Sequence, residues 1–218
     1  GKFWEQGPEF WDALIDVGLR NHYVAAVEAF PVMRDTAQRV GEDATVAMFQ
    51  ISSFGGNGRA FNTAYGCGKA ALDRLSSDIG FEMKPEGVAA FSVYPSIVRT
   101  EMMQEQIASG NFEARTGIRP LVTESPLLTG RVIAALAASP RSSTLPRSGG
   151  IVITAEEARA RGVVDEDGAS PSSIRSLQFI LPCVLWPRLE RRMQRRLPPP
   201  PEVPDVRLPL WLMRAAPE

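Results

Sequence analysis

The sequence predicts an α/β protein in which short buried strands alternate with helices. Three apolar runs have the length of buried strands and lie at residues 45–53, 87–95 and 149–154. Helical segments surround them, and the clearest of these cover residues 8–39 and 126–138. A chain of 218 residues with 44% apolar residues has the size and composition of one globular domain.

The first predicted helix begins at Pro8, because proline is well tolerated in the first turn, and it extends to about Arg39. Apolar residues at helical spacing give this helix one apolar face, formed by Phe10, Trp11, Leu14, Ile15 and Leu19. The strand predicted at 45–53 follows it and ends in two hydroxyl residues, Ser52 and Ser53.

A loop rich in glycine separates this strand from the next helix. Asn62 or Thr63 could cap that helix, because short polar side chains satisfy the free N–H groups of the first turn. The helix leads to the strand predicted at 87–95. A polar helix over 101–121, the helix at 126–138 and the last strand complete an α/β domain that we assign to residues 1–155.

Residues 156–218 form a C-terminal extension of different composition. Its apolar segment at 177–186 is broken by Pro182, and five arginines follow within 188–196. Four consecutive prolines at 198–201 predict an extended polyproline stretch. Apolar and basic residues in this arrangement could lie on an anionic membrane surface, pack on a partner subunit, or remain disordered.

Tyr65 and Lys69 are the residues with the clearest chemical potential. At positions i and i+4 of a helix, their side chains lie on one face. An ammonium beside a phenol favours the phenolate and lowers a pKa that starts at about 10. Such a phenol can give a proton to an alkoxide or take one from an alcohol. Taken alone, the pair also fits a half-buried tyrosine beside a solvated lysine.

The surroundings of this pair resemble the short-chain dehydrogenase/reductase family. The signature of that family is a serine, a Tyr-x-x-x-Lys motif and a Pro-Gly-x-Val-x-Thr segment, and here Ser53, Tyr65, Lys69, Pro95 and Thr100 follow the same order. The resemblance covers most of the chain and is strongest up to about residue 105. It implies a doubly wound, Rossmann-type parallel sheet, of which the three predicted strands are the fifth, sixth and seventh.

The resemblance also implies a role for each motif residue. Tyr65 is the general acid/base, Lys69 lowers its pKa and holds the cofactor ribose, and Ser53 holds the substrate carbonyl oxygen. The implied cofactor-binding residues are Tyr65, Lys69, Pro95, Ile97, Val98 and Thr100, the last at the nicotinamide amide. The implied reaction is hydride transfer at a small-molecule carbonyl or secondary alcohol with NADP(H) or NAD(H), and we favour NADP(H). The helix at 101–121 occupies the place of the family's mobile substrate lid.

Three departures from the family pattern accompany these matches. The family usually places its active serine thirteen residues before the tyrosine, and here that position is Ser52. The active serine of the family is also normally the second of a Ser-Ser pair, which here is Ser53. We favour Ser53. Ser96 replaces the glycine of the Pro-Gly segment. Gly18 stands where the family has a catalytic asparagine, so a variant of the usual proton path is expected.

The sequence shows no strand followed by a glycine-rich turn and a helix, the unit that holds a dinucleotide pyrophosphate. Residues 66–71 fit Gly-x-Gly-x-x-Ala, but they lie inside the predicted Tyr65 helix. We therefore expect a fragment that lacks the nucleotide-binding N-terminal half and is inactive alone. In the intact protein we expect a homo-oligomer. The alternative is a non-catalytic interaction or membrane-surface module.

Composition excludes several other classes. A formal charge of −1 gives no field that would attract nucleic acid. His22 is the only histidine, which argues against a histidine-based metal cluster, and no metal site is expected. Cys67 and Cys183 suggest free thiols in a reducing compartment. No apolar run is long enough to span a bilayer, and we expect a cytoplasmic or endoplasmic-reticulum-associated protein.

Overall fold

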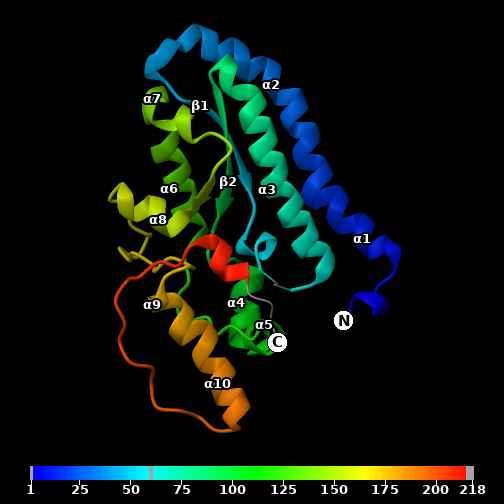
Figure 1. The fold of residues 1–218 in the computed structure, drawn as a ribbon, viewed down its shortest axis with the longest axis vertical. Coiled ribbons are helices and arrows are strands. Elements are labelled where there is room, and N and C mark those ends of the chain that lie inside the picture. Colours follow the sequence, from blue (N-terminus) through cyan, green and yellow to red (C-terminus); the bar gives the residue numbers. More distant parts are fainter. Residues whose placement is uncertain (1, 59–60, 215–218) are drawn as a thin grey trace.

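The computed structural model describes residues 2–58 and 61–214. Its centre is a sheet of three parallel strands in the order β1-β2-β3, namely Val46–Ile51, Val88–Tyr94 and Ile151–Ile153 (Figure 1). Each strand lies within one of the three predicted runs. All residues of β2 are buried, as expected for a strand that is paired along both edges and covered on both faces.

Helices cover both faces of this sheet (Figure 1). On one face lie α2 (Asn21–Val40) and α3 (Thr63–Met83), and on the other lie α6 (Pro126–Ala137) and α8 (Thr154–Ala160). This is the α/β arrangement that the sequence predicts, and it confirms the expected doubly wound architecture.

The alternation of side chains along β2 supplies a separate core to each helical layer. Val88 and Ala90 pack with Ala37 and Met83 on the side of α2 and α3. The intervening residues of β2 pack against α6, in a cluster that contains Ala89, Phe91, Val93, Leu128, Val132, Leu136 and Val152. The sheet is therefore fixed from both sides.

The first helical segment spans the predicted range but is not a uniform α-helix. It consists of α1 (Pro8–Ile15), a π-helical turn at Asp16–Arg20, and α2. The π-turn contains Gly18, at the position where the family has its asparagine. A β-carbon at Gly18 would have no other atom within 4 Å, so the absence of a side chain there is not imposed by packing.

The region predicted as one polar helix at 101–121 is two shorter helices. These are α4 (Glu101–Ala108) and α5 (Asn111–Thr116). Gly110 separates them with φ +73°, a left-handed conformation that glycine adopts without strain, and Gly117 ends α5 in the same way. The single-helix prediction is therefore wrong, because glycine conformation divides the segment.

The C-terminal extension folds back onto the rest of the chain. The sequence suggested that Pro182 breaks the apolar segment, but the helix continues through it. Pro182 lies in a π-turn (Leu181–Leu185) that joins α9 (Leu177–Ile180) to α10 (Trp186–Met193). The residues of this extension share a hydrophobic cluster with the end of β2 and with α5: Tyr94, Ile97, Phe112, Ile153, Ile174, Phe179, Ile180 and Cys183. The domain boundary placed after residue 155 falls inside α8.

The remaining elements are short. They are the helix α7 (Arg141–Thr144) and the 3₁₀ segments Phe3–Glu5, Gly41–Asp43, Phe54–Gly56, Lys84–Glu86, Leu145–Arg147 and Leu210–Arg214. Within residues 2–58 and 61–214, no helix has both the length and the apolar character required to cross a bilayer.

Close backbone contact at Gly80 brings α3 against the turn before β3. A β-carbon at Gly80 would lie 2.5 Å from the backbone nitrogen of Gly149, a distance at which one backbone must move. Ser148 reinforces the contact by donating a hydrogen bond from Oγ to the carbonyl of Gly80 at 2.9 Å. The absence of a side chain at Gly80 therefore sets the distance between α3 and the sheet.

Gly80→Ala is expected to lower the free energy of unfolding by about 1–3 kcal/mol, the usual cost of overpacking. Gly130→Ala in α6 is the matched control, because a β-carbon there meets no atom within 4 Å. It should stabilise the helix by up to about 1 kcal/mol through better helix propensity. Urea unfolding of both variants measures the two effects. Equal stability changes in the two variants would contradict the close-packing argument.

Candidate functional site

Tyr65 lies in the first turn of α3, at the carboxyl edge of the sheet. Asn62 caps this helix, because its Oδ1 accepts a hydrogen bond from the backbone N–H of Tyr65 at 2.9 Å. Of the two caps that the sequence allowed, the structure uses Asn62. The cap fixes the backbone that carries the phenol.

Ser53 lies directly opposite Tyr65. Its Oγ is 2.8 Å from Tyr65 Oη, within hydrogen-bond distance. The same Oγ accepts a hydrogen bond from the N–H of Gly55 at 3.0 Å, which holds the hydroxyl in place. A β-carbon at Gly55 would lie 2.6 Å from the Tyr65 ring, so only glycine fits between the loop and the phenol. The structure thus brings together two of the predicted catalytic residues.

Ser52 points away from the phenol. It is buried, and its Oγ donates to the carbonyl of Lys69 at 3.3 Å while its N–H donates to Val93 at 2.9 Å. These bonds tie β1 to α3 and β2. Of the two serines that the sequence left as candidates, Ser53 is therefore the one within reach of Tyr65.

Lys69 lies one helical turn after Tyr65 but does not contact the phenol oxygen. Its Nζ donates to the carbonyl of Ile51 at 2.8 Å and lies 5.9 Å from the centre of the Tyr65 ring. Burial lowers the pKa of Lys69, and the negative charge of Asp73 acts in the opposite direction. The side chain therefore carries a partly desolvated charge close to the ring.

The pKa of Tyr65 is raised, whereas the sequence suggested that Lys69 would lower it. Burial is the main cause, and the hydrogen bond with Ser53 opposes it. The prediction of a lowered pKa is wrong, because the effect of burial exceeds that of the hydrogen bond, and the Lys69 ammonium is bonded to the carbonyl of Ile51. A raised pKa leaves the phenol protonated at neutral pH and makes it a weaker acid, so the surroundings of Tyr65 in this structure do not move its pKa toward neutrality.

Sequence reasoning missed Asp73, which continues the row of Tyr65 and Lys69 along α3. Its Oδ1 accepts a hydrogen bond from Ser92 at 2.5 Å, and its Oδ2 accepts one from Tyr94. Both donors are in β2. The repeated spacing of four residues is the signal that could have identified Asp73 as a member of the same helix face.

The predicted cofactor segment leaves the end of β2 and leads into α4. Thr100 caps α4, because its Oγ1 accepts from the N–H of Met103 at 3.3 Å, and the residue is exposed. Ile97 is buried in the cluster shared with the extension, and Pro95 and Val98 are half-buried. Among the described residues, the buried Oγ of Ser96 has no hydrogen-bond partner.

The family described as short chain dehydrogenase matches residues 1–110. The chain belongs to the short-chain dehydrogenase family. It is 33% identical over 184 residues to "Dehydrogenase/reductase SDR family member 1" of Mus musculus, and the match covers 82% of this chain and 56% of the mouse protein. The human protein of the same name is 32% identical over the same length. The chain thus spans about half the length of these relatives.

Solved structures of other short-chain dehydrogenases share the fold. ElxO with NADP bound matches 71% of this chain and 60% of its own, with a TM-score of 0.58 and 22% identity. A 3-oxoacyl-acyl-carrier-protein reductase from Brucella melitensis matches 70% of this chain and 54% of its own, with a TM-score of 0.54 and 18% identity. These likenesses support the Rossmann-type architecture around β1, β2 and β3.

Glu124 is a second residue near the predicted cofactor segment that sequence reasoning missed. Its N–H donates to the carbonyl of Ile97 at 3.0 Å, and its own carbonyl accepts from Arg99 at 2.8 Å. The residue therefore pairs with the predicted cofactor segment through its backbone. Its side chain is fully buried, and Oε2 has no hydrogen-bond partner among the described residues.

This burial raises the pKa of Glu124 to about 7. The negative charge of Asp165 raises it further, whereas the N–H of Ser96, the hydroxyl of Thr129 and the charge of Arg99 oppose the shift. In the native state the Glu124 carboxyl therefore keeps its proton up to about pH 7, whereas in the unfolded chain it releases the proton near its ordinary pKa of 4.5. No pattern in the sequence signals this property, because it depends on complete burial.

Glu124 should make the protein less stable as the pH rises from 4.5 to about 7. The folded protein binds more protons than the unfolded chain in this window, so the free energy of unfolding should fall, by about 3 kcal/mol in total. Glu124→Gln should remove this part of the pH dependence. Urea unfolding across the window measures the difference. Glu105→Gln, at an exposed position, is the control, and its free energy of unfolding should fall with pH as that of the wild type does. Identical pH profiles for wild type and Glu124→Gln would contradict the assignment.

Proposed function

We propose that these residues form the catalytic part of an NAD(P)-dependent oxidoreductase that acts on a carbonyl or a secondary alcohol. The observation that carries this proposal is the 2.8 Å contact between Ser53 Oγ and Tyr65 Oη, with Lys69 one turn further along the same helix face. Family membership supports the reaction class.

The described residues fit the nicotinamide end of such a cofactor. Lys69 carries a half-buried cation beside the phenol, and the unpartnered Oγ of Ser96 lies in the segment between β2 and Thr100. In the described part of the glycine-rich loop after β1, Gly55 and Gly56 are packed against Tyr65 and α3 and leave no room for a pyrophosphate. We therefore propose that sequence outside these 218 residues supplies the pyrophosphate contacts, and that this chain alone has no reductase activity.

The catalytic groups have separate tasks. The bound cofactor supplies the hydride that reaches the carbonyl carbon. Tyr65 gives its proton to the carbonyl oxygen, while Ser53 donates a hydrogen bond to that oxygen. Burial disfavours the phenolate that remains, and the positive charge of Lys69, 5.9 Å from the ring centre, offsets part of that cost. We favour NADP(H); one solved neighbour contains NADP, and a second Brucella melitensis reductase structure contains NAD.

We also propose that the intact protein self-associates through α1 and α2. Five large apolar residues remain between 39% and 68% exposed along α1, the π-turn that follows it, and α2: Trp11, Val17, Tyr23, Val24 and Val27. An interface would remove them from water. A non-catalytic interaction module would use the same surface. Sedimentation velocity should show a dimer or larger assembly that Val24→Lys/Val27→Lys dissociates, and a monomer at all concentrations would contradict the proposal.

Tyr65→Phe is expected to lower kcat/KM by about 10²–10⁴-fold, because the ring remains and only the transferable proton is lost. The measurement requires protein that carries both these residues and a pyrophosphate-binding unit. Cofactor affinity, measured by titration calorimetry, should change little. Reduction at the wild-type rate in Tyr65→Phe would exclude Tyr65 as the proton donor.

Ser53→Ala should reduce kcat by about 10²–10³-fold, the usual effect of losing one donor to a developing oxyanion. Ser52→Ala is the matched control, because it removes a neighbouring hydroxyl that bonds to the carbonyl of Lys69 and not to the phenol. Its main effect should be on stability. If Ser52→Ala reduced kcat more than Ser53→Ala did, the roles of the two serines would have to be exchanged.

A further inference from the structure

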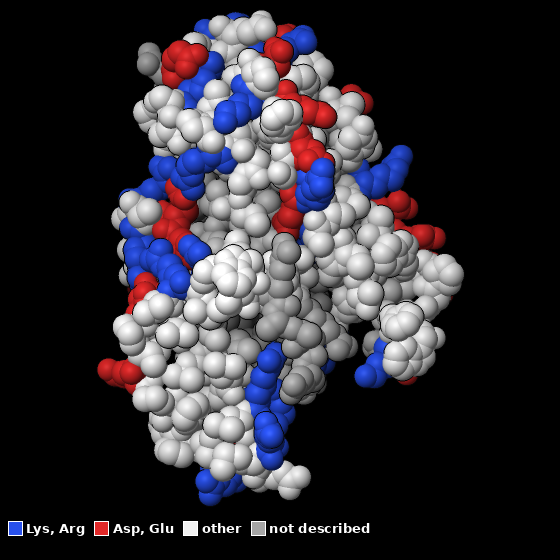
Figure 2. Space-filling model, in the orientation of Figure 1, with Lys and Arg blue, Asp and Glu red and all other residues white. Residues whose placement is uncertain are grey.

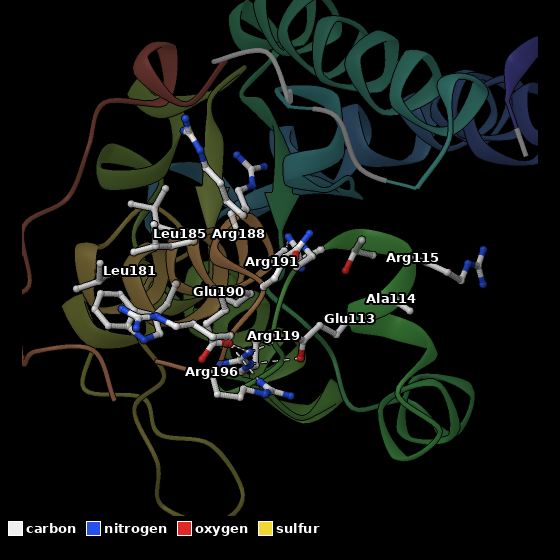
Figure 3. Close-up of a pocket in the computed structure, with 18 of the residues that line it drawn as sticks. Glu113, Ala114, Arg115, Arg119, Leu181, Leu185, Arg188, Glu190, Arg191 and Arg196 are labelled. Atoms are coloured by element: carbon white, nitrogen blue, oxygen red, sulfur yellow. Dashed lines mark hydrogen bonds and ion pairs between the residues drawn. The ribbon is translucent and has the colours of Figure 1, made fainter. Parts of the chain in front are cut away.

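An open cleft of about 1300 Å³ lies between α5 and α10, outside the predicted catalytic residues (Figure 3). Seven arginines and two glutamates line it, together with an apolar wall. The arginines are Arg115, Arg119, Arg188, Arg191, Arg192, Arg195 and Arg196. In Figure 2 the lower end of the molecule, where α10 lies, shows basic side chains and almost no acidic ones. The cleft is therefore strongly positive.

The two glutamates of this cleft are already neutralised. Arg119 pairs with Glu113 at 3.2 Å and with Glu190 at 2.5 Å, and Arg196 pairs with Glu190 at 3.2 Å. Figure 3 shows Arg119 between the two carboxylates, whereas Arg115 points away from them. The positive charge that remains on α10 is therefore not balanced by the carboxylates of the cleft.

Three arginines of α10 share one helix face. They are Arg188, Arg191 and Arg192, at positions i, i+3 and i+4. In the part of the chain that the structure describes, none of the three has a carboxylate partner. Arg191 donates instead to the carbonyl of Gly117 at 3.2 Å. Like charges at this spacing repel one another and disfavour the helix, and a bound anion would relieve that repulsion.

Apolar residues complete the cleft. Leu181, Leu185 and Leu189 recur at intervals of four along the same helical segment, and Leu185 and Leu189 are 47% and 41% exposed. Trp186 lines the cleft with its ring held in place, because its indole N–H donates to the carbonyl of Pro198 at 2.9 Å. A ligand that fits this cleft has both an apolar skeleton and a negative group.

The cleft reaches the catalytic residues through Phe61. This residue lines the cleft, and its ring centre lies 5.2 Å from that of Tyr65 and 6.5 Å from that of Phe112. A molecule in the cleft can therefore lie close to the phenol while its other end lies near α10.

We propose that the substrate of this site is an amphipathic carbonyl compound or alcohol with a phosphate or carboxylate group, which Arg188, Arg191 and Arg192 bind. The proposal rests on the reductase function proposed above and adds the substrate class. The site is concave, and Trp186 is fixed by a hydrogen bond, so a soluble molecule fits it better than a membrane surface does.

Octyl phosphate is a suitable probe, because it has the negative group and the apolar chain but no reactive carbonyl. Titration calorimetry with the full chain should show one binding site. In Arg188→Gln/Arg192→Gln the dissociation constant should rise at least about tenfold, as expected for two lost charge-assisted contacts. Arg188→Lys/Arg192→Lys should retain part of the affinity, which excludes unfolding as the cause. Octyl glucoside, the neutral analogue, should bind much more weakly.

Arg34→Gln/Arg74→Gln is the matched control, because it removes the same number of charges from exposed positions on α2 and α3. It should leave octyl phosphate affinity within about twofold. An equal loss in both double variants would overturn the proposal, since the effect would then be one of net charge. Binding only to vesicles of phosphatidylcholine and phosphatidylserine, with none to octyl phosphate, would also overturn it and identify a membrane site.

The binding test separates this inference from the proposed reductase activity. Tyr65→Phe should bind octyl phosphate as well as the wild type does, because the phenol proton is not part of the anion site. If the arginine variants lose binding but Tyr65→Phe does not affect reduction, the anion site stands and the catalytic assignment fails. If reduction depends on Tyr65 but octyl phosphate affinity does not depend on the arginines, the substrate class is wrong.

Discussion

The attachment of α3 to the sheet is the constraint on which the rest of the site depends. Asp73 accepts hydrogen bonds from Ser92 and Tyr94, so a half-buried carboxylate joins the middle of α3 to β2. At the far end of the helix, the close approach of Gly80 to the turn before β3 sets the spacing. A helix held at these two points can place the Tyr65 hydroxyl opposite Ser53 with little freedom, and such fixed geometry is what proton transfer needs.

Local patterns in the sequence were sufficient to predict the three strands and the start of α3. The three strands and the start of α3, for which Asn62 and Thr63 were the candidate caps, depend on short-range chemistry, and each lies within the expected range. The π-turns, the division at Gly110 and the back-folded extension were not predicted, because they depend on tertiary packing or on a single backbone angle. The pKa of Tyr65 was likewise not predicted, because it depends on burial in the folded protein. A spacing of four residues predicted that Lys69 would act on the Tyr65 phenol, but burial has the larger effect.

The proposed substrate site adjoins a part of the molecule that is assembled from distant parts of the chain. The end of β2, the helix α5 and the extension share one hydrophobic cluster, which includes Tyr94, Phe112 and Cys183. Tyr94 also donates to Asp73, so one residue links this cluster to the helix of the proton donor. The extension is accordingly packed against the rest of the domain, although its composition suggested a separate tail.

The two π-turns have a consequence for how relatives of this chain can differ in length. Each π-turn accommodates one residue more than the α-helical turn it replaces, without interrupting the helix. Removal of one residue from Asp16–Arg20 would convert the π-turn to an ordinary α-helical turn, so the segments before and after it would keep nearly the same orientation. The same deletion within the regular part of α2 would instead rotate one segment against the other by about 100°. At the two π-turns, relatives can therefore differ in length by one residue while Trp11 and its neighbours still face the same direction.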